Sequence, residues 1–267
     1  MISSDLPLAP AAPSQFRTLT LVALAMVALA LLWSLADARV LDGAPVWMKP
    51  LKFALSFALL FGTLALVEAR LSAPVRTGAT LRIVAWVMTA AFLSEMAYMT
   101  YQAALGEASH FNLSTPFNAV MYGTVMAAGA VALVASVAVI GWCARRDAQA
   151  ALGPATREGI WLGFQATFVL TMIVAGYMSG QPGHHVGLHP EGAATIPLFG
   201  WSGAVGDLRP AHFASLHAMQ ALPLLGLLLD ARGGGVTAIR VAAIAYGAVT
   251  LAVFAQALMG LPLIPLG

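Results

Sequence analysis

The sequence predicts an all-α membrane protein with seven transmembrane helices. The first observation is composition: 60% of the 267 residues are hydrophobic and 9% are charged, whereas roughly 25% of the residues in a typical soluble domain are charged. The second is pattern, because apolar stretches of about 20 residues, the length that crosses a bilayer, alternate with polar connections. The third is the single cysteine, Cys143, which excludes an internal disulfide and a cysteine-rich metal site.

Each predicted helix ends where the sequence becomes polar or rich in glycine and proline, as expected where the backbone leaves the hydrocarbon. The first apolar run is long for the core of a secretion signal, so we expect it to be retained as a helix. Residues 1–17 are expected to form a disordered cytoplasmic tail and residues 18–267 a single transmembrane domain. The predicted helices cover 18–36, 51–67, 81–102, 116–142, 160–179, 210–229 and 241–261.

The basic residues predict the orientation of the bundle. Arg17 and the arginines near positions 70–82, 145–157 and 232–240 fall on one side, and only Arg39, Lys49, Lys52 and Arg209 fall on the other. The positive-inside bias makes the first side cytoplasmic, with the N-terminus inside and the C-terminus outside. We expect a bacterial inner membrane, and the dispersed cations exclude a nucleic-acid partner.

All six histidines fall on the outer side of this topology. Imidazole is the commonest metal ligand among side chains, and it also titrates near neutral pH. The one-sided distribution therefore predicts a metal or haem site facing the periplasm. The six are His110, His184, His185, His189, His212 and His217.

The sequence predicts that two helix hairpins are copies of one unit. Residues 98–102 (Tyr-Met-Thr-Tyr-Gln) align with residues 177–181 (Tyr-Met-Ser-Gly-Gln), and each is followed by a small residue, a histidine and a phenylalanine, at 109–111 and 211–213. The repeat relates the third and fourth helices to the fifth and sixth. His110 and His212 are then equivalent, and we expect them to approach a common axis near the outer surface.

The central candidate ligands are His110, His212 and His217. Pro210 suits the first turn of the sixth helix, so His212 lies in that turn, with His217 deeper and about 140° away around the helix. Gln220 shares the face of His217 and is a candidate cofactor contact. Opposed histidines suit a bis-imidazole haem b, and three convergent imidazoles suit a copper, iron or zinc ion. Hydrogen bonds to neighbouring helices are the alternative role.

The long outer loop at about 181–209 carries three further candidate ligands, His184, His185 and His189. Gly187 and Pro190 argue against a helix that would align them. The loop is therefore either a solvated metal-binding tract or a cap over the helix ends.

Glu95 is the only acid well inside a predicted span, and it heads a polar stripe with Tyr98 and Gln102 on one helix face. An intramembrane carboxylate is expensive and normally paired or functional. We expect these three residues to be catalytic, with Glu95 as a proton relay or as a partner of a histidine. A neutral acid bonded to a tyrosine is the structural alternative.

Lys49, Lys52 and Arg209 lie on the side where positive charge is disfavoured. The lysines could extend to lipid headgroups. Alternatively, the three cations form a clamp that binds haem propionates, a lipid phosphate or an anionic substrate.

Two blocks carry a resemblance: Ser-His-Phe-Asn at 109–112 with Ser-Thr-Pro-Phe at 114–117, and the stretch 206–220 around Gly-Asp-Leu-Arg and Leu-His-Ala-Met-Gln. Both resemble segments of bacterial multi-pass inner-membrane proteins of unassigned function. The similarity to b-type cytochromes is architectural only, because His110 precedes its helix instead of lying on it.

Together these patterns predict a membrane protein that binds haem or a transition metal at its outer face, for redox chemistry as an oxidoreductase. Its expected partners are membrane lipids and either a quinone or a periplasmic redox protein. One alternative is a proton-coupled transporter or channel that uses Glu95. Another is a membrane-embedded hydrolase or transferase that acts on lipid.

Overall fold

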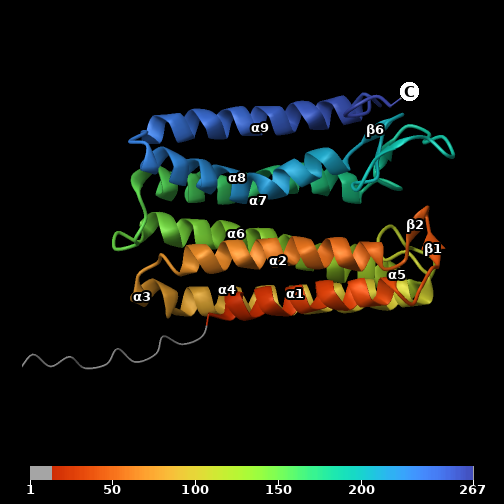
Figure 1. Ribbon diagram of the computed structural model, residues 1–267, viewed down its shortest axis with the longest axis horizontal. Coiled ribbons are helices and arrows are strands. Elements are labelled where there is room, and N and C mark those ends of the chain that lie inside the picture. Colours follow the sequence, from red (N-terminus) through yellow and green to blue (C-terminus); the bar gives the residue numbers. More distant parts are fainter. Residues whose placement is uncertain (1–13, 267) are drawn as a thin grey trace, which may run out of the picture.

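The chain is an all-α multi-pass membrane protein, and the computed structural model describes residues 14–266 (Figure 1). Within these residues, seven helical spans are long and apolar enough to cross a membrane, and they run side by side. They are α1 (Gln15–Ser34), α2 (Met48–Glu68), α4 (Ala79–Leu105), the composite span α5–η1–α6 (Pro116–Arg146), α7 (Pro154–Ser179), α8 (Arg209–Ala231) and α9 (Val236–Leu258); the short α3 (Ala73–Arg76) precedes α4.

The ends of the helices follow local capping chemistry. Helix α1 begins at Gln15, before the expected residue 18, because the Ser14 hydroxyl accepts a hydrogen bond from the Arg17 amide at 3.2 Å and caps the first turn. Residues 15–17 of the expected tail are therefore helical, and residues 1–13 lie outside the described part. Helix α4 continues to Leu105 because the next residue, Gly106, adopts φ of 74° and ends it.

The fourth span is not a regular α-helix throughout. It is composed of α5 (Pro116–Val120), the π-helical turn η1 (Met121–Met126) and α6 (Ala127–Arg146). A π turn places an extra residue in the helical ladder, and such turns often occur at functional sites.

Helices α7 and α8 pack closely because glycine lies where their backbones approach. A Cβ atom on Gly159 would lie 2.5 Å from the Leu222 carbonyl oxygen, and one on Gly163 would lie 2.6 Å from that of Ala218. On the other side of the bundle, Phe92 packs against Phe57 and Phe61 with ring centroids 4.8 and 5.1 Å apart. These contacts fix the helices that surround the candidate site.

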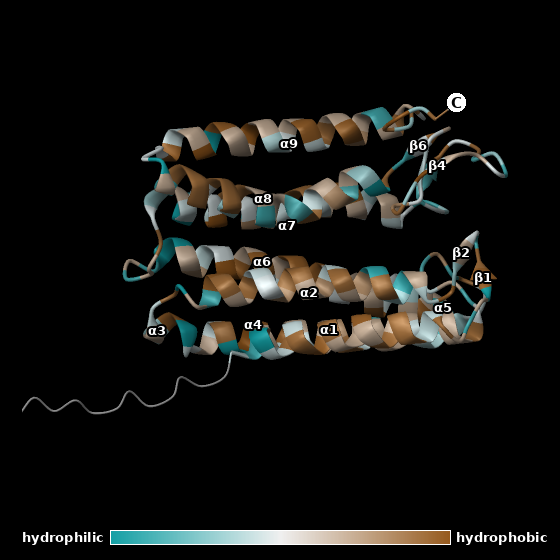
Figure 2. Ribbon diagram, viewed as in Figure 1, coloured by the Kyte–Doolittle hydropathy of each residue, from teal (hydrophilic) through white to brown (hydrophobic). Residues whose placement is uncertain are grey.

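Polar side chains hold the end of the bundle where most arginines lie, and hydrophilic residues gather at both bundle ends (Figure 2). The Asp230 carboxylate accepts hydrogen bonds from the Ala155 and Thr156 amides at 2.9 and 2.8 Å, and so caps α7. Glu158 forms ion pairs with Arg145 and with Arg240.

At the opposite end, the connections form three small antiparallel ladders. The first joins β1 (Val40–Leu41) to β2 (Ala44–Pro45) between α1 and α2. The connection from α7 to α8 forms the other two, in which β3 (His185–Val186) pairs with β6 (Gly206–Asp207) and β4 (Thr195–Ile196) pairs with β5 (Trp201–Ser202). We call residues 180–208 the cap.

Candidate functional site

Every histidine lies toward one end of the bundle, which we call the histidine end. His110 lies between α4 and α5, three others lie in the cap, and His212 and His217 lie on α8, which begins at Arg209. Figure 1 places these connections and the start of α8 at the same end. The structure therefore has the one-sided distribution that the sequence predicted.

A pocket with a volume of about 400 Å³ extends from the histidine end into the bundle. Residues of α2, α4, η1, α6, α7 and α8 line it, and His110, His212 and His217 all contribute to its wall. The rest of the wall is mainly apolar. This size and composition are typical of sites for small molecules and cofactors.

His110 is held in place by its neighbours on three sides. Its Nδ1 atom lies 3.1 Å from the Ser109 hydroxyl, and its ring packs against Phe53 and Tyr122 with centroids 5.5 and 5.8 Å apart. Burial, with smaller contributions from the charges of Lys49 and His212, lowers the pKa of His110 to about 3. The ring is therefore neutral at pH 7, the form in which imidazole binds a metal.

The two α8 histidines differ in their hydrogen bonds. His217 Nδ1 lies 3.1 Å from Gln220 Oε1, and the Gln220 amide nitrogen donates to the Thr63 hydroxyl at 3.2 Å. His212 Nδ1 is buried and has no hydrogen-bond partner among the described residues. A buried imidazole nitrogen without a partner loses its solvation, so a bound ligand that supplied a partner would be stabilising.

The three pocket histidines do not form a compact ion site. Among residues 14–266, the only group of three potential ligands whose donor atoms all lie within 4.8 Å of one another is His184, His185 and Asp207, in the cap. His110, His212 and His217 border the same pocket, but their donor atoms do not all lie within that distance of one another. The pocket is the space that a bound group could occupy.

The predicted polar stripe on α4 divides into two parts. Glu95 lines the pocket, and its Oε1 atom is buried without a partner among the described side chains. Tyr98 and Gln102 instead donate hydrogen bonds to Asn118 Oδ1 at 3.2 and 3.1 Å and do not line the pocket. The structure therefore brings only Glu95 to the candidate site.

Asn118 is a positioning residue that the sequence analysis missed. Its Nδ2 atom donates to the Ser114 hydroxyl at 3.2 Å, and the Thr115 hydroxyl accepts from its backbone amide at 3.1 Å. Together with Tyr98 and Gln102, it ties the connection that carries His110 to α4. The sequence signal was Thr115-Pro116, a capping residue followed by proline at the start of a helix.

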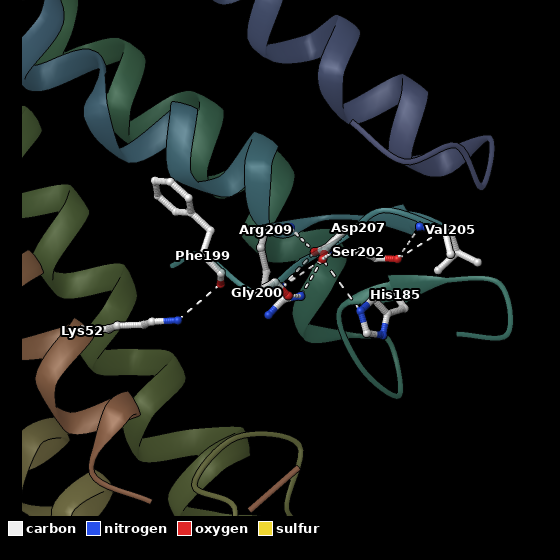
Figure 3. Close-up of polar contacts among 9 residues, drawn as sticks. Lys52, His185, Phe199, Gly200, Ser202, Val205, Asp207 and Arg209 are labelled. Atoms are coloured by element: carbon white, nitrogen blue, oxygen red, sulfur yellow. Dashed lines mark hydrogen bonds and ion pairs between the residues drawn. The ribbon is translucent and has the colours of Figure 1, made fainter. Parts of the chain in front are cut away.

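The three predicted anion-binding cations have separate partners. Arg209 forms a bidentate ion pair with Asp207, with its Nε and Nη2 atoms at 2.9 and 2.6 Å, and its Nη2 also donates to the Gly200 carbonyl at 2.7 Å (Figure 3). Lys52 donates to the Phe199 carbonyl at 3.3 Å. The charge of Lys49 contributes to the lowered pKa of His110, after the larger effect of burial.

The cap holds its own cluster of potential metal ligands. His185 Nε2 lies 3.7 Å from Asp207 Oδ2. The His185 ring stacks on that of His189 and is tilted against that of His184, with both centroids 4.2 Å away. Burial lowers the pKa of His184 to about 4, with further contributions from Arg209 and His185. The place of Asp207 in this cluster was not foreseen from the sequence.

Comparison with known proteins found no matching family model, no similar curated protein and no similar solved structure for this chain.

Proposed function

We propose that this protein is a membrane redox protein whose pocket at the histidine end binds haem b, which His110 and His212 would hold. One observation carries the proposal: histidines from two separate parts of the chain, the α4–α5 connection and the first turn of α8, border one largely apolar pocket. Two imidazoles that border one apolar pocket are the protein ligands that a bis-histidine haem needs.

The hydrogen bonds of the pocket histidines support this assignment. In metal-binding histidines, one ring nitrogen usually bonds a protein group, which orients the ring and leaves the other nitrogen for the metal. His110 and His217 both have Nδ1 within 3.1 Å of a neighbouring side-chain oxygen. Their Nε2 atoms are the ones left for ligation. His212 has an unpartnered Nδ1 atom instead.

The number of ligands favours haem over a single copper, iron or zinc ion in the pocket. An ion held by three imidazoles needs all three donor atoms close together, and His110, His212 and His217 form no group with all donor atoms within 4.8 Å in the described chain. A haem iron needs only two imidazoles. Bound haem would supply one-electron transfer. The protein would orient it through the two rings and exclude water with the apolar wall, and Lys49 would lie near His110 to neutralise a propionate.

We place the pocket on the periplasmic face of an inner membrane, with the N-terminus in the cytoplasm. The support is the concentration of arginines at the other end of the bundle, which the positive-inside bias makes cytoplasmic. Electrons would pass to or from a membrane quinone or a periplasmic redox protein.

The test is the absorption spectrum of the purified full-length protein, with haem and metal content. We expect a Soret band and about one haem per chain, and we expect His110→Ala and His212→Ala each to abolish or shift the low-spin bands. His184→Gln, in the cap, is the matched control and should keep the wild-type spectrum. Protein without a Soret band would overturn haem as the bound group. Metal that is lost in His110→Ala or His212→Ala but kept in His184→Gln would replace haem with an ion in the pocket.

A second candidate function is proton-coupled transport, and the position of Glu95 favours it. Its buried, unpartnered Oε1 atom lies at the wall of the pocket, where it could carry a proton. In proteoliposomes of metal-free protein, proton-driven flux that Glu95→Gln abolishes and His110→Gln preserves would favour this function. Equal flux in wild-type and Glu95→Gln vesicles would exclude it.

A further inference from the structure

We propose a second site, separate from the pocket, at which the cap binds one divalent transition-metal ion through His184, His185 and Asp207. The inference does not depend on haem in the pocket, because none of these three residues lines it. It assigns a metal ion to the only three-residue cluster in the described part of the chain whose potential metal-binding atoms all lie within 4.8 Å of one another.

The distances between the potential ligand atoms are slightly longer than those in an occupied zinc site. Zinc binds imidazole nitrogen and carboxylate oxygen at about 2.0–2.2 Å, which in a tetrahedral site puts neighbouring ligand atoms about 3.4 Å apart. His185 Nε2 and Asp207 Oδ2 are 3.7 Å apart, and all three donor atoms lie within 4.8 Å of one another. The 3.7 Å separation is too long for a hydrogen bond but close to the separation of two ligands of one ion.

The backbone holds the three ligands in this arrangement. His185 and Asp207 are direct partners in the antiparallel β3–β6 ladder, and the Leu208 amide donates to the His184 carbonyl at 2.9 Å. Strand β6 is itself anchored, because the Gly206 amide donates to the Gly260 carbonyl at 2.8 Å. The ion would therefore bind a largely formed site.

The hydrogen bonds around Asp207 are those expected around a ligating carboxylate. Arg209 holds both carboxylate oxygens, and the Ser202 amide donates to Oδ2 at 2.9 Å (Figure 3). Outer contacts of this kind orient a metal ligand. By contrast, His185 Nε2 is buried and has no hydrogen-bond partner in the described chain. A metal ion would supply that missing partner.

The ligand set selects the class of ion. Two imidazoles and one carboxylate suit zinc, copper or nickel, whereas calcium and magnesium prefer oxygen ligands. Three protein ligands also leave a fourth position for water. Asp207 lies two residues before α8, so the ion would lie close to the start of that helix.

The experiment uses the full-length protein, stripped with a chelator and dialysed against zinc, with bound zinc measured by elemental analysis. We expect about one zinc per chain, no comparable binding of calcium or magnesium, and a higher thermal midpoint when zinc is present. His184→Gln and His185→Gln should each weaken zinc binding by at least about 10- to 100-fold, the loss that follows removal of even an outer contact.

The matched control is His217→Gln, which alters a pocket histidine and should bind zinc as the wild type does. If wild-type protein binds no more zinc than the His184→Gln/His185→Gln double variant, the cap site is overturned. Loss of zinc in His217→Gln, with retention in the cap variants, would overturn it by placing the ion in the pocket. The absorption spectrum of the same samples reports haem independently, so failure of one proposal is distinguishable from failure of the other.

Discussion

The close packing of α7 against α8 predicts that Gly159→Ala destabilises the protein. The new Cβ atom would lie 2.5 Å from the Leu222 carbonyl oxygen and 3.2 Å from the Pro223 Cα atom, where ordinary contact begins at 3.4 Å. Both neighbours are backbone atoms of α8, so they cannot rotate away as a side chain could. The two helices would have to separate locally by almost 1 Å.

The magnitude follows from two opposing effects. Overpacking of a well-packed interface costs about 1–3 kcal/mol, and replacing glycine by alanine within a helix returns about 0.5–1 kcal/mol. We expect a net loss on the order of 1–2 kcal/mol in the free energy of unfolding.

The assay is unfolding in mixed detergent micelles, followed by tryptophan fluorescence. The control is Gly247→Ala on α9, because a Cβ atom there would meet no heavy atom within 4 Å. We expect the control to be as stable as the wild type or slightly more so. If Gly159→Ala matches the control in stability, the reasoning from backbone contact is refuted.

Three further predictions concern polar groups. Asp230→Ala removes the carboxylate that accepts hydrogen bonds from the first amides of α7, and should lower the free energy of unfolding by about 0.5–2 kcal/mol in the same assay. An unchanged free energy would show that these hydrogen bonds do not stabilise the fold. Glu95→Leu removes a buried acid with an unpartnered oxygen and should raise the free energy of unfolding by about 1 kcal/mol. A lower free energy of unfolding would show that the carboxyl group has a hydrogen-bond partner. Burial opposes ionisation of Asp147, but hydrogen bonds from Ser72 outweigh it and lower its pKa below 3.8. The carboxylate therefore stabilises the fold above pH 3.8 and loses this effect as the pH falls further. Asp147→Asn should flatten that acid limb in a pH series, and an unchanged slope would contradict the assignment.

The sequence was sufficient for the fold because bilayer thickness and backbone hydrogen bonding leave few alternatives. Seven apolar runs predicted the seven spans that the structure has. The helix ends shifted by a few residues, since Ser14 and Gly106 act through local geometry that hydropathy does not report.

The site was less predictable, because it depends on contacts between distant segments. Helical periodicity placed Glu95 and Gln102 on one face, but only the packing of α5 explains why Gln102 bonds to Asn118 while Glu95 borders the pocket. Likewise, the pairing of His185 with Asp207 depends on a two-residue ladder across the cap. No periodic pattern in the sequence could reveal that pairing.

The π-helical turn η1 determines how the side chains of α5 are rotated about the helix axis relative to those of α6. Each residue of a helix advances the chain by about 100° and 1.5 Å, so deleting one residue from Met121–Met126 would restore a regular α-helix and rotate α5 by about that angle. Asn118 would then turn away from Tyr98 and Gln102, and the tie that positions the His110 connection would be lost. The inserted residue therefore lets α6 keep its packing in the bundle while α5 presents Asn118 to α4.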